Sequence, residues 1–172
     1  MRRDFTINAL YYTTADFAIY DYTGGIHDLH HKIIRIIGDP TTRYREDPVR
    51  MLRAARFAAK LGFTIEPHTA APMYELASTL QDIPAARLFD ETLKLFMSGQ
   101  GEATYHQLKA YGVFAQLCPE TGEVLAGNTP MAESLIINAL QNTDKRINQG
   151  KTVTPAFIFA ALLWPAVERR HK

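Results

Sequence analysis

The stretch TRYREDPVRMLRAARF, residues 42–57, decides the fold because it marks the point where the sequence turns from strand-like to helical. Asp47 is a possible N-cap and Pro48 suits the first helical position, so a helix is predicted from Pro48 to Lys60. The pair Leu61-Gly62 follows as a stop, since glycine readily takes the left-handed conformation that ends helices. The sequence beyond this helix is also predicted to be mainly helical.

Apolar periodicity and capping signals predict five more helices downstream. Their expected ranges are 68–80, 84–97, 102–111, 130–143 and 155–164. Pro72 is expected to split or kink the first of them, and Gly112 to cap the third. The segments 119–128 and 144–153 are predicted to be loops.

The N-terminal part of the sequence contains strand signals as well as a helix signal. It predicts a short buried helix over residues 4–12 and two strands, 17–20 and 33–37, separated by a turn at Gly24-Gly25. Two strands do not form a stable sheet alone, and no third strand is predicted downstream. The chain is therefore expected to be a piece of a longer one, with partner strands before Met1.

Composition bounds the function mainly through what it excludes. The 172 residues are 47% hydrophobic, enough for a folded core. A net charge of +1 gives no global positive field, so any nucleic-acid site must be local. The single cysteine, Cys118, excludes an internal disulfide and a cysteine-based zinc site, and it fits a reducing, cytoplasmic location. No stretch predicts a signal peptide or a membrane span.

Basic residues crowd around the start of the helix that begins at residue 48, and they supply candidate binding groups. On this helix Asp47 and Arg50 should project near one another. Arg50, Arg53 and Arg56 should form a ridge. A carboxylate acceptor beside a guanidinium donor suits the edge of a nucleobase, and the other arginines can hold phosphates. The alternative is structural, with Asp47 as a cap and the arginines paired with nearby glutamates.

Four segments in a fixed order carry a resemblance to a known family. They are RRDFTINAL (2–10), DYTGGIHDL (21–29), REDPVRMLR (45–53) and ARLFDE (86–91). Together they resemble signatures of the class II nucleotidyltransferases, the family of poly(A) polymerases and tRNA CCA-adding enzymes. The likeness is close over residues 2–118 and weak beyond them.

The resemblance implies a mainly α fold, in which a helical neck and a partial body follow a small α/β remnant of the nucleotidyltransferase head. The second signature resembles the hinge between head and neck. The implied domains are the head remnant at 1–38, a nucleotide- and RNA-binding neck at 39–118, and the start of the body at 119–172.

The resemblance also implies roles for individual residues. Arg2, Arg3 and Asp4 would contact the phosphates and ribose of an incoming nucleotide. Asp47 and Arg50 would select its base by hydrogen bonds to the Watson–Crick edge.

Four further residues would support this nucleotide-binding site. Arg53 and Arg56 lie on the same helix and can hold phosphates. Arg87 and Glu91 would stiffen the base site from behind, and their i, i+4 spacing allows them to pair on a helix face.

Enzymes of this family transfer a nucleotide to an RNA 3′ end with Mg²⁺. The stretches 45–50, 60–63 and 82–87 resemble the poly(A) branch, which implies AMP from ATP as the added group. The family holds its metal with a Gly-Ser turn and an Asp-x-Asp strand, and the sequence contains neither. The chain is therefore predicted to hold no catalytic or metal-binding residue and to be inactive alone, while the parent enzyme binds ATP and an RNA 3′ end.

Other functions stay open at this point. One is CCA addition to tRNA, and another is a non-catalytic helical RNA-binding module. A third is a His-Asp phosphohydrolase, suggested by HDLHH at 27–31, although neighbouring residues point apart and a surface loop is expected there. Five tyrosines could stack on bases, although core or boundary positions are expected for most of them: Tyr11, Tyr12, Tyr20, Tyr22 and Tyr44.

Overall fold

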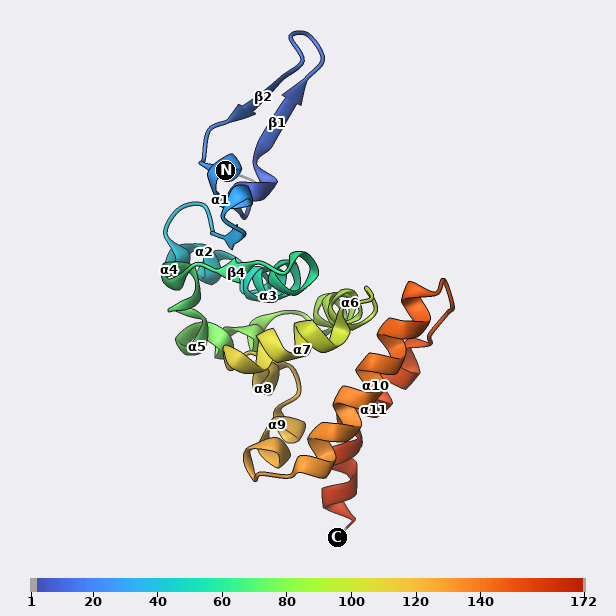
Figure 1. Ribbon diagram of the computed structural model, residues 1–172. Helices are drawn as coiled ribbons and strands as arrows, with labels where there is room; N and C mark the ends of the chain where they lie inside the picture. Colours follow the sequence, from blue (N-terminus) through green and yellow to red (C-terminus); the bar gives the residue numbers. More distant parts are fainter. Residues whose placement is uncertain (1–2, 172) are drawn as a thin grey trace.

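Helices dominate the computed structural model, which describes residues 3–171. In chain order the elements are η1 (Thr6–Asn8), β1 (Leu10–Thr13), β2 (Ala18–Asp21), α1 (Gly25–His30), β3 (Ile33–Ile34), α2 (Pro40–Glu46), α3 (Val49–Leu61), β4 (Thr64–Ile65), α4 (Pro67–Ala70), α5 (Met73–Leu76), η2 (Ala77–Asp82), α6 (Ala85–Phe96), α7 (Gly101–Ala110), α8 (Phe114–Leu117), α9 (Pro119–Ala126), α10 (Pro130–Asn148) and α11 (Pro155–Arg170). Figure 1 shows an elongated molecule, with the β1–β2 hairpin at one end and α9–α11 at the other. The predicted mainly α fold is confirmed.

The strands of the described residues form two separate two-stranded sheets. β1 pairs antiparallel with β2, with Tyr11 opposite Tyr20. β3 pairs in parallel with β4, with Ile34 opposite Ile65. The expectation of no further strand downstream was wrong, because α3 brings the chain back beside β3 and the two residues of β4 pair there.

The tyrosines in and next to the hairpin lie in solvent, contrary to the core or boundary positions expected for most of them. Tyr12 is 62% exposed and Tyr22 is 74% exposed. The hairpin extends away from the helices in Figure 1, so its side chains meet little of the core. Tyr44, by contrast, is fully buried and donates its hydroxyl to the Thr69 carbonyl oxygen at 2.8 Å.

The short helix predicted over residues 4–12 is wrong. Phe5 forms a bridge with Ile36, and the Thr6 N–H donates to the Arg35 carbonyl oxygen at 3.0 Å. These contacts tie the backbone to the segment after β3 and leave it extended before the turn of η1. Apolar spacing signalled the burial of Phe5 correctly, but the partner that buries it lies far away in sequence.

The segment DYTGGIHDL builds a tight junction between β2 and α1. The Asp21 carboxylate caps the helix start by accepting from the N–H groups of Thr23, Gly25 and Ile26 at 2.9–3.1 Å. Gly25 has no room for a side chain, because a Cβ there would lie 2.3 Å from the Thr6 carbonyl oxygen. This close approach packs α1 directly on η1.

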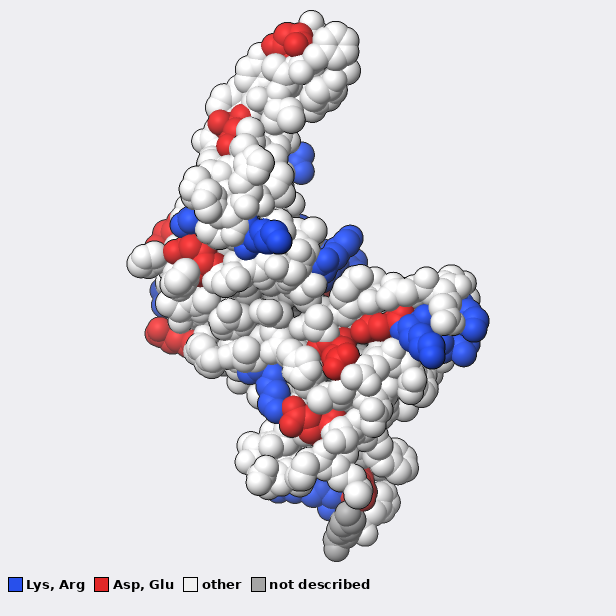
Figure 2. All heavy atoms as spheres, viewed as in Figure 1, with Lys and Arg blue, Asp and Glu red and all other residues white. Residues whose placement is uncertain are grey.

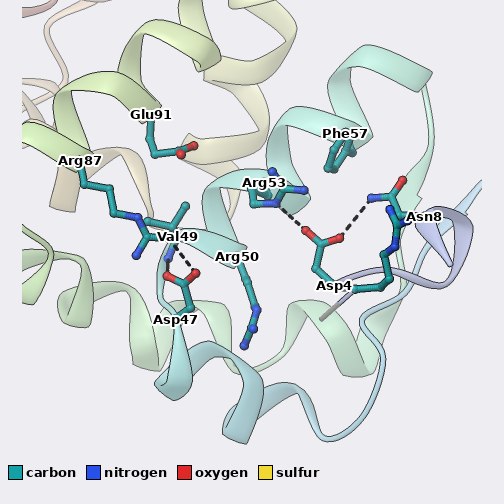
Figure 3. A pocket seen from close by; sticks show the side chains of 10 residues that line it. Asp4, Asn8, Asp47, Val49, Arg50, Arg53, Phe57, Arg87 and Glu91 are labelled. Carbon is teal, nitrogen blue, oxygen red and sulfur yellow. Dashed lines mark hydrogen bonds and ion pairs between the residues drawn. The ribbon is translucent and has the colours of Figure 1, made fainter. Parts of the chain in front are cut away.

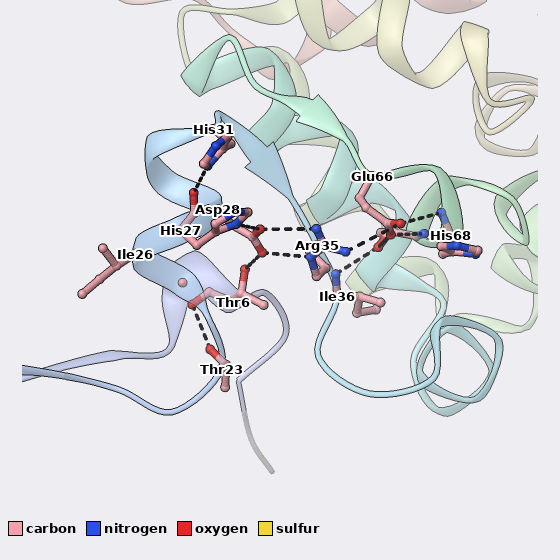
Figure 4. A network of polar contacts seen from close by, with 12 residues as sticks. Thr6, Thr23, Ile26, His27, Asp28, His31, Arg35, Ile36, Glu66 and His68 are labelled. Carbon is pink, nitrogen blue, oxygen red and sulfur yellow. Dashed lines mark hydrogen bonds and ion pairs between the residues drawn. The ribbon is translucent and has the colours of Figure 1, made fainter.

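A network of charges joins α1 to the helical part of the chain (Figure 4). Asp28 is buried and accepts from Thr6 Oγ1 at 2.7 Å and from Arg35 Nε at 3.0 Å. The same guanidinium lies 3.7 Å from Glu66 Oε1, and Glu66 caps α4 by accepting from the Thr69 N–H at 2.8 Å. Burial opposes ionisation of Asp28, but the donors outweigh it and hold the pKa of this carboxyl below its ordinary value.

The histidine cluster at 27–31 belongs to this junction and does not form the expected surface loop. Most of it lies in α1, and the His27 and His31 rings stack with centroids 4.1 Å apart. Residues 3–171 contain no group of three or more histidine, cysteine or acidic side chains able to hold a metal ion. The phosphohydrolase alternative therefore has no metal centre in the described part of the chain.

α3 supplies the central helix of the core, and Gly62 ends it in the left-handed conformation with φ of 65°, as predicted. Its N-terminal boundary differs from the prediction by one residue, because Pro48 is the N-cap and the helix begins at Val49. Asp47 still acts as a cap, since its Oδ1 accepts from the Val49 N–H at 3.3 Å. The buried face consists of Val49, Met51, Leu52, Ala54, Ala55 and Ala58.

The predicted helices at 84–97 and 102–111 are confirmed as α6 and α7. The range 68–80 is broken into α4, α5 and η2, and the break falls at Pro72 as expected. The predicted loop 119–128 was wrong, because α9 occupies most of it. A Cβ at Gly122 would lie 2.9 Å from Ala115, so this glycine lets α9 pack closely on α8.

The last two helices are longer than predicted. α10 runs to Asn148, into the range 144–153 that was expected to be a loop, and α11 runs to Arg170. Pro165 lies inside α11.

None of the helices described is long and apolar enough to cross a membrane. Cys118 is buried, and burial raises the pKa of its thiol to about 12.

Substitution at Gly25 tests the tight junction between η1 and α1. Gly25→Ala should lower the free energy of unfolding by about 1–3 kcal/mol, because the new methyl group overlaps the Thr6 carbonyl oxygen. Urea unfolding measures the change. Gly127→Ala is the control, since a Cβ there would lie 3.3 Å from its nearest atom, and its effect should stay within about 0.5 kcal/mol. Equal stability of the two variants would contradict the assignment.

Candidate functional site

A hollow of about 540 Å³ lies between the N-terminal segment, α3 and α6 (Figure 3). It unites three stretches that are far apart in the sequence. The residues that line it are Arg3, Asp4, Asn8, Asp47, Val49, Arg50, Arg53, Phe57, Arg87 and Glu91. Four arginines and three carboxylates make the hollow strongly polar, with both donors and acceptors at its surface.

Asp4 and Arg53 form one end of the hollow. Arg53 Nε lies 2.5 Å from Asp4 Oδ2, and Asn8 Nδ2 donates to Asp4 Oδ1 at 3.2 Å. The Phe5 N–H donates to the same oxygen at 3.0 Å. Burial opposes ionisation of Asp4, but these donors outweigh it and hold the pKa of this carboxyl below its ordinary value.

An aromatic ring closes this end. Phe57 has the Arg53 guanidinium 5.2 Å from its ring centroid, and Phe5 packs edge-on at 5.9 Å. Arg56 lies at the same distance, 5.2 Å, from the Phe57 centroid but does not line the hollow. Each step of three residues turns a helix by about 60° away from the starting face. The predicted ridge therefore carries Arg56 beyond the hollow that contains Arg50 and Arg53.

Asp47 and Arg87 form the other end. Arg87 Nη2 donates to Asp47 Oδ2 at 2.8 Å, and this hydrogen bond raises the pKa of the guanidinium above its ordinary value. The pair of Arg87 with Glu91, which their spacing allows, is not formed among the described residues, and Glu91 accepts from Lys94 Nζ at 3.1 Å. An i, i+4 pair is worth only a few tenths of a kcal/mol, so a partner from another element readily displaces it.

Arg50 lies between the two ends (Figure 3). Its Nη1 donates to Glu46 Oε2 at 2.9 Å and to the Arg43 carbonyl oxygen at 2.8 Å. The hydrogen bond from Arg50, together with the positive charges of Arg43 and Arg50, holds the pKa of the Glu46 carboxyl below its ordinary value. Arg50 and Asp47 thus line one hollow, as expected, without being bonded to each other. The cap at Asp47 and the pair with Glu46 are the features that the structural alternative predicted.

Most of the residues singled out from the sequence meet in this hollow. Arg3, Asp4, Asp47, Arg50, Arg53, Arg87 and Glu91 all line it. Arg2 lies outside the described residues. Asn8 and Phe57 are additional lining residues that sequence reasoning did not identify as site residues. Both occur within the quoted segments, Asn8 in RRDFTINAL, so their positions in those segments were the available signal.

Comparison with known proteins assigns the chain to a family. Residues 62–125 match the family described as "Probable RNA and SrmB- binding site of polymerase A", and residues 1–35 match "Poly A polymerase head domain". The chain is 54% identical to Poly(A) polymerase I of Salmonella typhi, over 99% of this chain and 37% of that protein. The chain belongs to the poly(A) polymerase and CCA-adding nucleotidyltransferase family.

One further sequence relative and one solved structure are also similar to this chain. The CCA-adding enzyme of Limosilactobacillus fermentum is 47% identical over 63% of this chain and 26% of that protein. A solved structure described as a tRNA-processing enzyme in apo form 2 has a TM-score of 0.73 at 25% identity, covering 94% of this chain and 47% of that one. The chain spans 37% of the length of the Salmonella relative, so that relative contains further polypeptide that has no counterpart in the sequence described here.

The hollow does not fit the Mg²⁺ that the family implies. Asp4 and Asp47 are its candidate ligands, but Arg53 holds the first and Arg87 holds the second. Glu91 is bound to Lys94. Within residues 3–171 no three such ligands come together. The carboxylates that line the hollow within the described residues therefore do not form a Mg²⁺ site.

The pH dependence of stability tests the Asp4 interactions. Because the folded pKa of Asp4 is depressed, its contribution is fully present above the ordinary carboxyl pKa of about 3.9 and is lost as the pH falls through the folded value. Asp4→Asn should lower the free energy of unfolding by about 1–3 kcal/mol at neutral pH. The difference from the unsubstituted chain should shrink below about pH 4, as followed by urea unfolding.

Glu75→Gln is the matched control for Asp4→Asn, since it neutralises an exposed carboxylate on α5. It should change stability by less than about 0.5 kcal/mol. A difference for Asp4→Asn that stays constant down to pH 2 would contradict the assigned role of the Asp4 carboxylate.

Proposed function

We propose that this chain is the nucleotide-selecting part of a polynucleotide adenylyltransferase, which adds AMP from ATP to RNA 3′ ends. The observation that carries the proposal is the hollow in Figure 3, where groups from separate motifs meet with the chemistry that a nucleotide needs. The match with a Poly(A) polymerase I over 99% of the chain supports adenylate as the added group. The activity belongs to the longer protein, since the chain spans 37% of that relative.

Asp47 and Arg50 are the proposed base-reading groups. Arg87 holds Oδ2 of Asp47 in place. Within residues 3–171 the other oxygen, Oδ1, accepts only from the Val49 N–H, at 3.3 Å. An adenine amino group can donate to that oxygen. Among the described residues, Arg50 donates only through Nη1, so Nη2 and Nε can donate to ring nitrogens of the base.

The other end of the hollow is the proposed site for the phosphates and ribose. Arg3 and Arg53 supply positive charge for the phosphates. Asp4 can accept from a ribose hydroxyl, and Asn8 orients that carboxylate through its 3.2 Å hydrogen bond. Arg2 would join this group by its position in the sequence.

The RNA partner of the proposed reaction supplies the 3′-hydroxyl that attacks the α-phosphorus of ATP, and pyrophosphate leaves. Metal-bound carboxylates normally bring these atoms into line. The sequence contains no Gly-Ser turn and no Asp-x-Asp strand. The role proposed for this chain is therefore to hold and select the nucleotide while another part of the longer protein performs the transfer.

CCA addition to tRNA is the second candidate function. The 47% identity to a CCA-adding enzyme favours it, but that match covers 63% of the chain, against 99% for the Poly(A) polymerase I. Incorporation of CMP distinguishes the two candidates, since a polyadenylating enzyme rejects CTP and a CCA-adding enzyme uses it.

Removal of the Arg50 guanidinium tests the base-reading proposal. In the full-length protein, Arg50→Ala should lower the ratio of kcat/KM for ATP to kcat/KM for CTP by about tenfold or more, because one contact that reads the base is lost. Primer extension with each nucleotide and a labelled RNA measures the ratio.

Arg45→Ala is the matched control, since it removes the same side chain from an exposed position that does not line the hollow. It should leave the ratio unchanged. An Arg50→Ala protein that folds normally and keeps its preference for ATP would refute base reading by Arg50.

The chain alone should not extend RNA, because nothing in its sequence matches the metal-binding elements of the family. Incubation of residues 1–172 with ATP, Mg²⁺ and an RNA primer should give no product above a protein-free control. The full-length protein is the positive control. Extension by the chain alone, after removal of host polymerases, would show that catalytic groups lie within it.

A further inference from the structure

We propose that the turn between α10 and α11 binds single-stranded RNA at a site separate from the hollow in Figure 3. The choice of RNA as ligand rests on the proposed function. The site lies outside both matched family segments, 1–35 and 62–125. Lys145, Arg146 and Lys151 bring three positive charges to the turn, and Figure 2 shows basic side chains gathered beside it.

These cations are not used to hold the fold together. Within residues 3–171, Lys145 and Lys151 are exposed and form no ion pair, and Arg146 donates only to the Thr152 carbonyl oxygen at 3.3 Å. Many other basic side chains, such as Arg87, are held by carboxylates. The turn is therefore a place where positive charge remains available to a partner.

The acidic residue next to this group is turned inward. Asp144 accepts from the N–H of Gly101 at 2.6 Å and from the N–H of Glu102 at 3.1 Å, at the start of α7. The negative charge of Asp144 therefore interacts with the positive N-terminal end of α7. The cations of the turn therefore keep their positive charge at the surface, where they lie next to acidic side chains in Figure 2, although the whole chain carries a net charge of only +1.

A hollow of about 350 Å³ lies beside the cations, which is within the range of small-ligand sites. Phe157 lines it with 47% of the residue exposed, so a ring is available for stacking on a base. Asn142, Thr152 and Thr154 also line it and offer amide and hydroxyl groups for a base edge or a ribose 2′-hydroxyl. Positive charge combined with an exposed ring is the pattern of single-strand binders, whereas an acidic peptide needs only the charge.

Two contacts connect this turn to the elements of the first hollow. Phe89 of α6 stacks on Phe159 of α11, with ring centroids 4.9 Å apart and planes inclined by 9°. Asn148 at the end of α10 donates to the Gly99 carbonyl oxygen at 3.1 Å, just after α6. Since α6 lines the nucleotide hollow, an RNA whose 3′ end reaches that hollow can be held by its upstream nucleotides at the turn.

Binding of a short, labelled oligoadenylate to the full-length protein tests the site, with fluorescence anisotropy as the readout. Lys145→Gln together with Lys151→Gln should weaken binding about tenfold at low salt. The slope of log Kd against log salt concentration should fall by about 1.4, because each phosphate contact with a single strand contributes roughly 0.7. Phe157→Ala should weaken binding by about fivefold or more and leave the slope unchanged, since stacking releases no counterions.

The double variant Arg169→Gln and Arg170→Gln is the matched control, because it removes the same charge from the opposite end of α11. These arginines pair with the exposed Glu123 and Glu120, and RNA affinity should not change. Unchanged affinity and slope in the lysine variant would overturn the proposal, and so would an equal loss in the control. A larger loss for duplex RNA than for oligoadenylate would overturn recognition of a single strand.

Anisotropy needs no catalysis, so it separates this inference from the proposed function. Failure of the proposed function would appear as full-length protein that binds RNA but adds no AMP to it. If the enzyme is active, the lysine variant should raise the KM for RNA and leave both kcat and the preference for ATP over CTP unchanged.

Discussion

The guanidinium of Arg35, held between Asp28 and Glu66, is the interaction on which the site depends. It joins the N-terminal segment, whose β1–β2 hairpin is too small to be stable alone, to the first helices of the core. Asp28 is also bonded to Thr6, so the same network fixes the backbone just after Asp4. The network acts together with the Phe5–Ile36 bridge and the Asp4–Arg53 pair, which also hold this segment beside α3.

The ion pairs of the charged hollow matter more for the placement of its side chains than for the stability of the fold. Arg53 and Arg87 are each about a third to a half exposed, so their bonds to Asp4 and Asp47 contribute modestly to stability. Their effect is to fix two carboxylates at opposite ends of one hollow. Among the described residues, the partners of Arg50 between them are Glu46, which is half exposed, and a backbone carbonyl. Such a side chain can exchange its partner for a nucleobase at little cost.

Local signals in the sequence predicted the helices well and the tertiary partners poorly. The helix that follows Asp47 was correct to within one residue because proline and glycine mark its ends. The helix expected over residues 4–12 was wrong because Phe5 pairs with Ile36, a contact that periodicity does not report.

The site shows the same division between local signals and tertiary contacts. Motif resemblance identified which side chains gather in the hollow, but their bonds followed proximity in space. Arg87 donates to Asp47, which lies 40 residues away in the sequence, and not to Glu91 on its own helix. An isolated asparagine has no periodicity of its own, so Asn8 could be suspected only from its place in RRDFTINAL, and its hydrogen bond to Asp4 is a tertiary contact.

α6 couples the two regions in which we place nucleotide and RNA. Arg87 and Phe89 are two residues apart, so they project from different sides of the helix. One side holds Asp47 at the nucleotide hollow, and the other stacks on Phe159 of α11. A shift of α6 would therefore move the Asp47 carboxylate and the α10–α11 turn together. In the arrangement that we propose, this one helix sets the distance between the incoming nucleotide and the RNA behind the 3′ end.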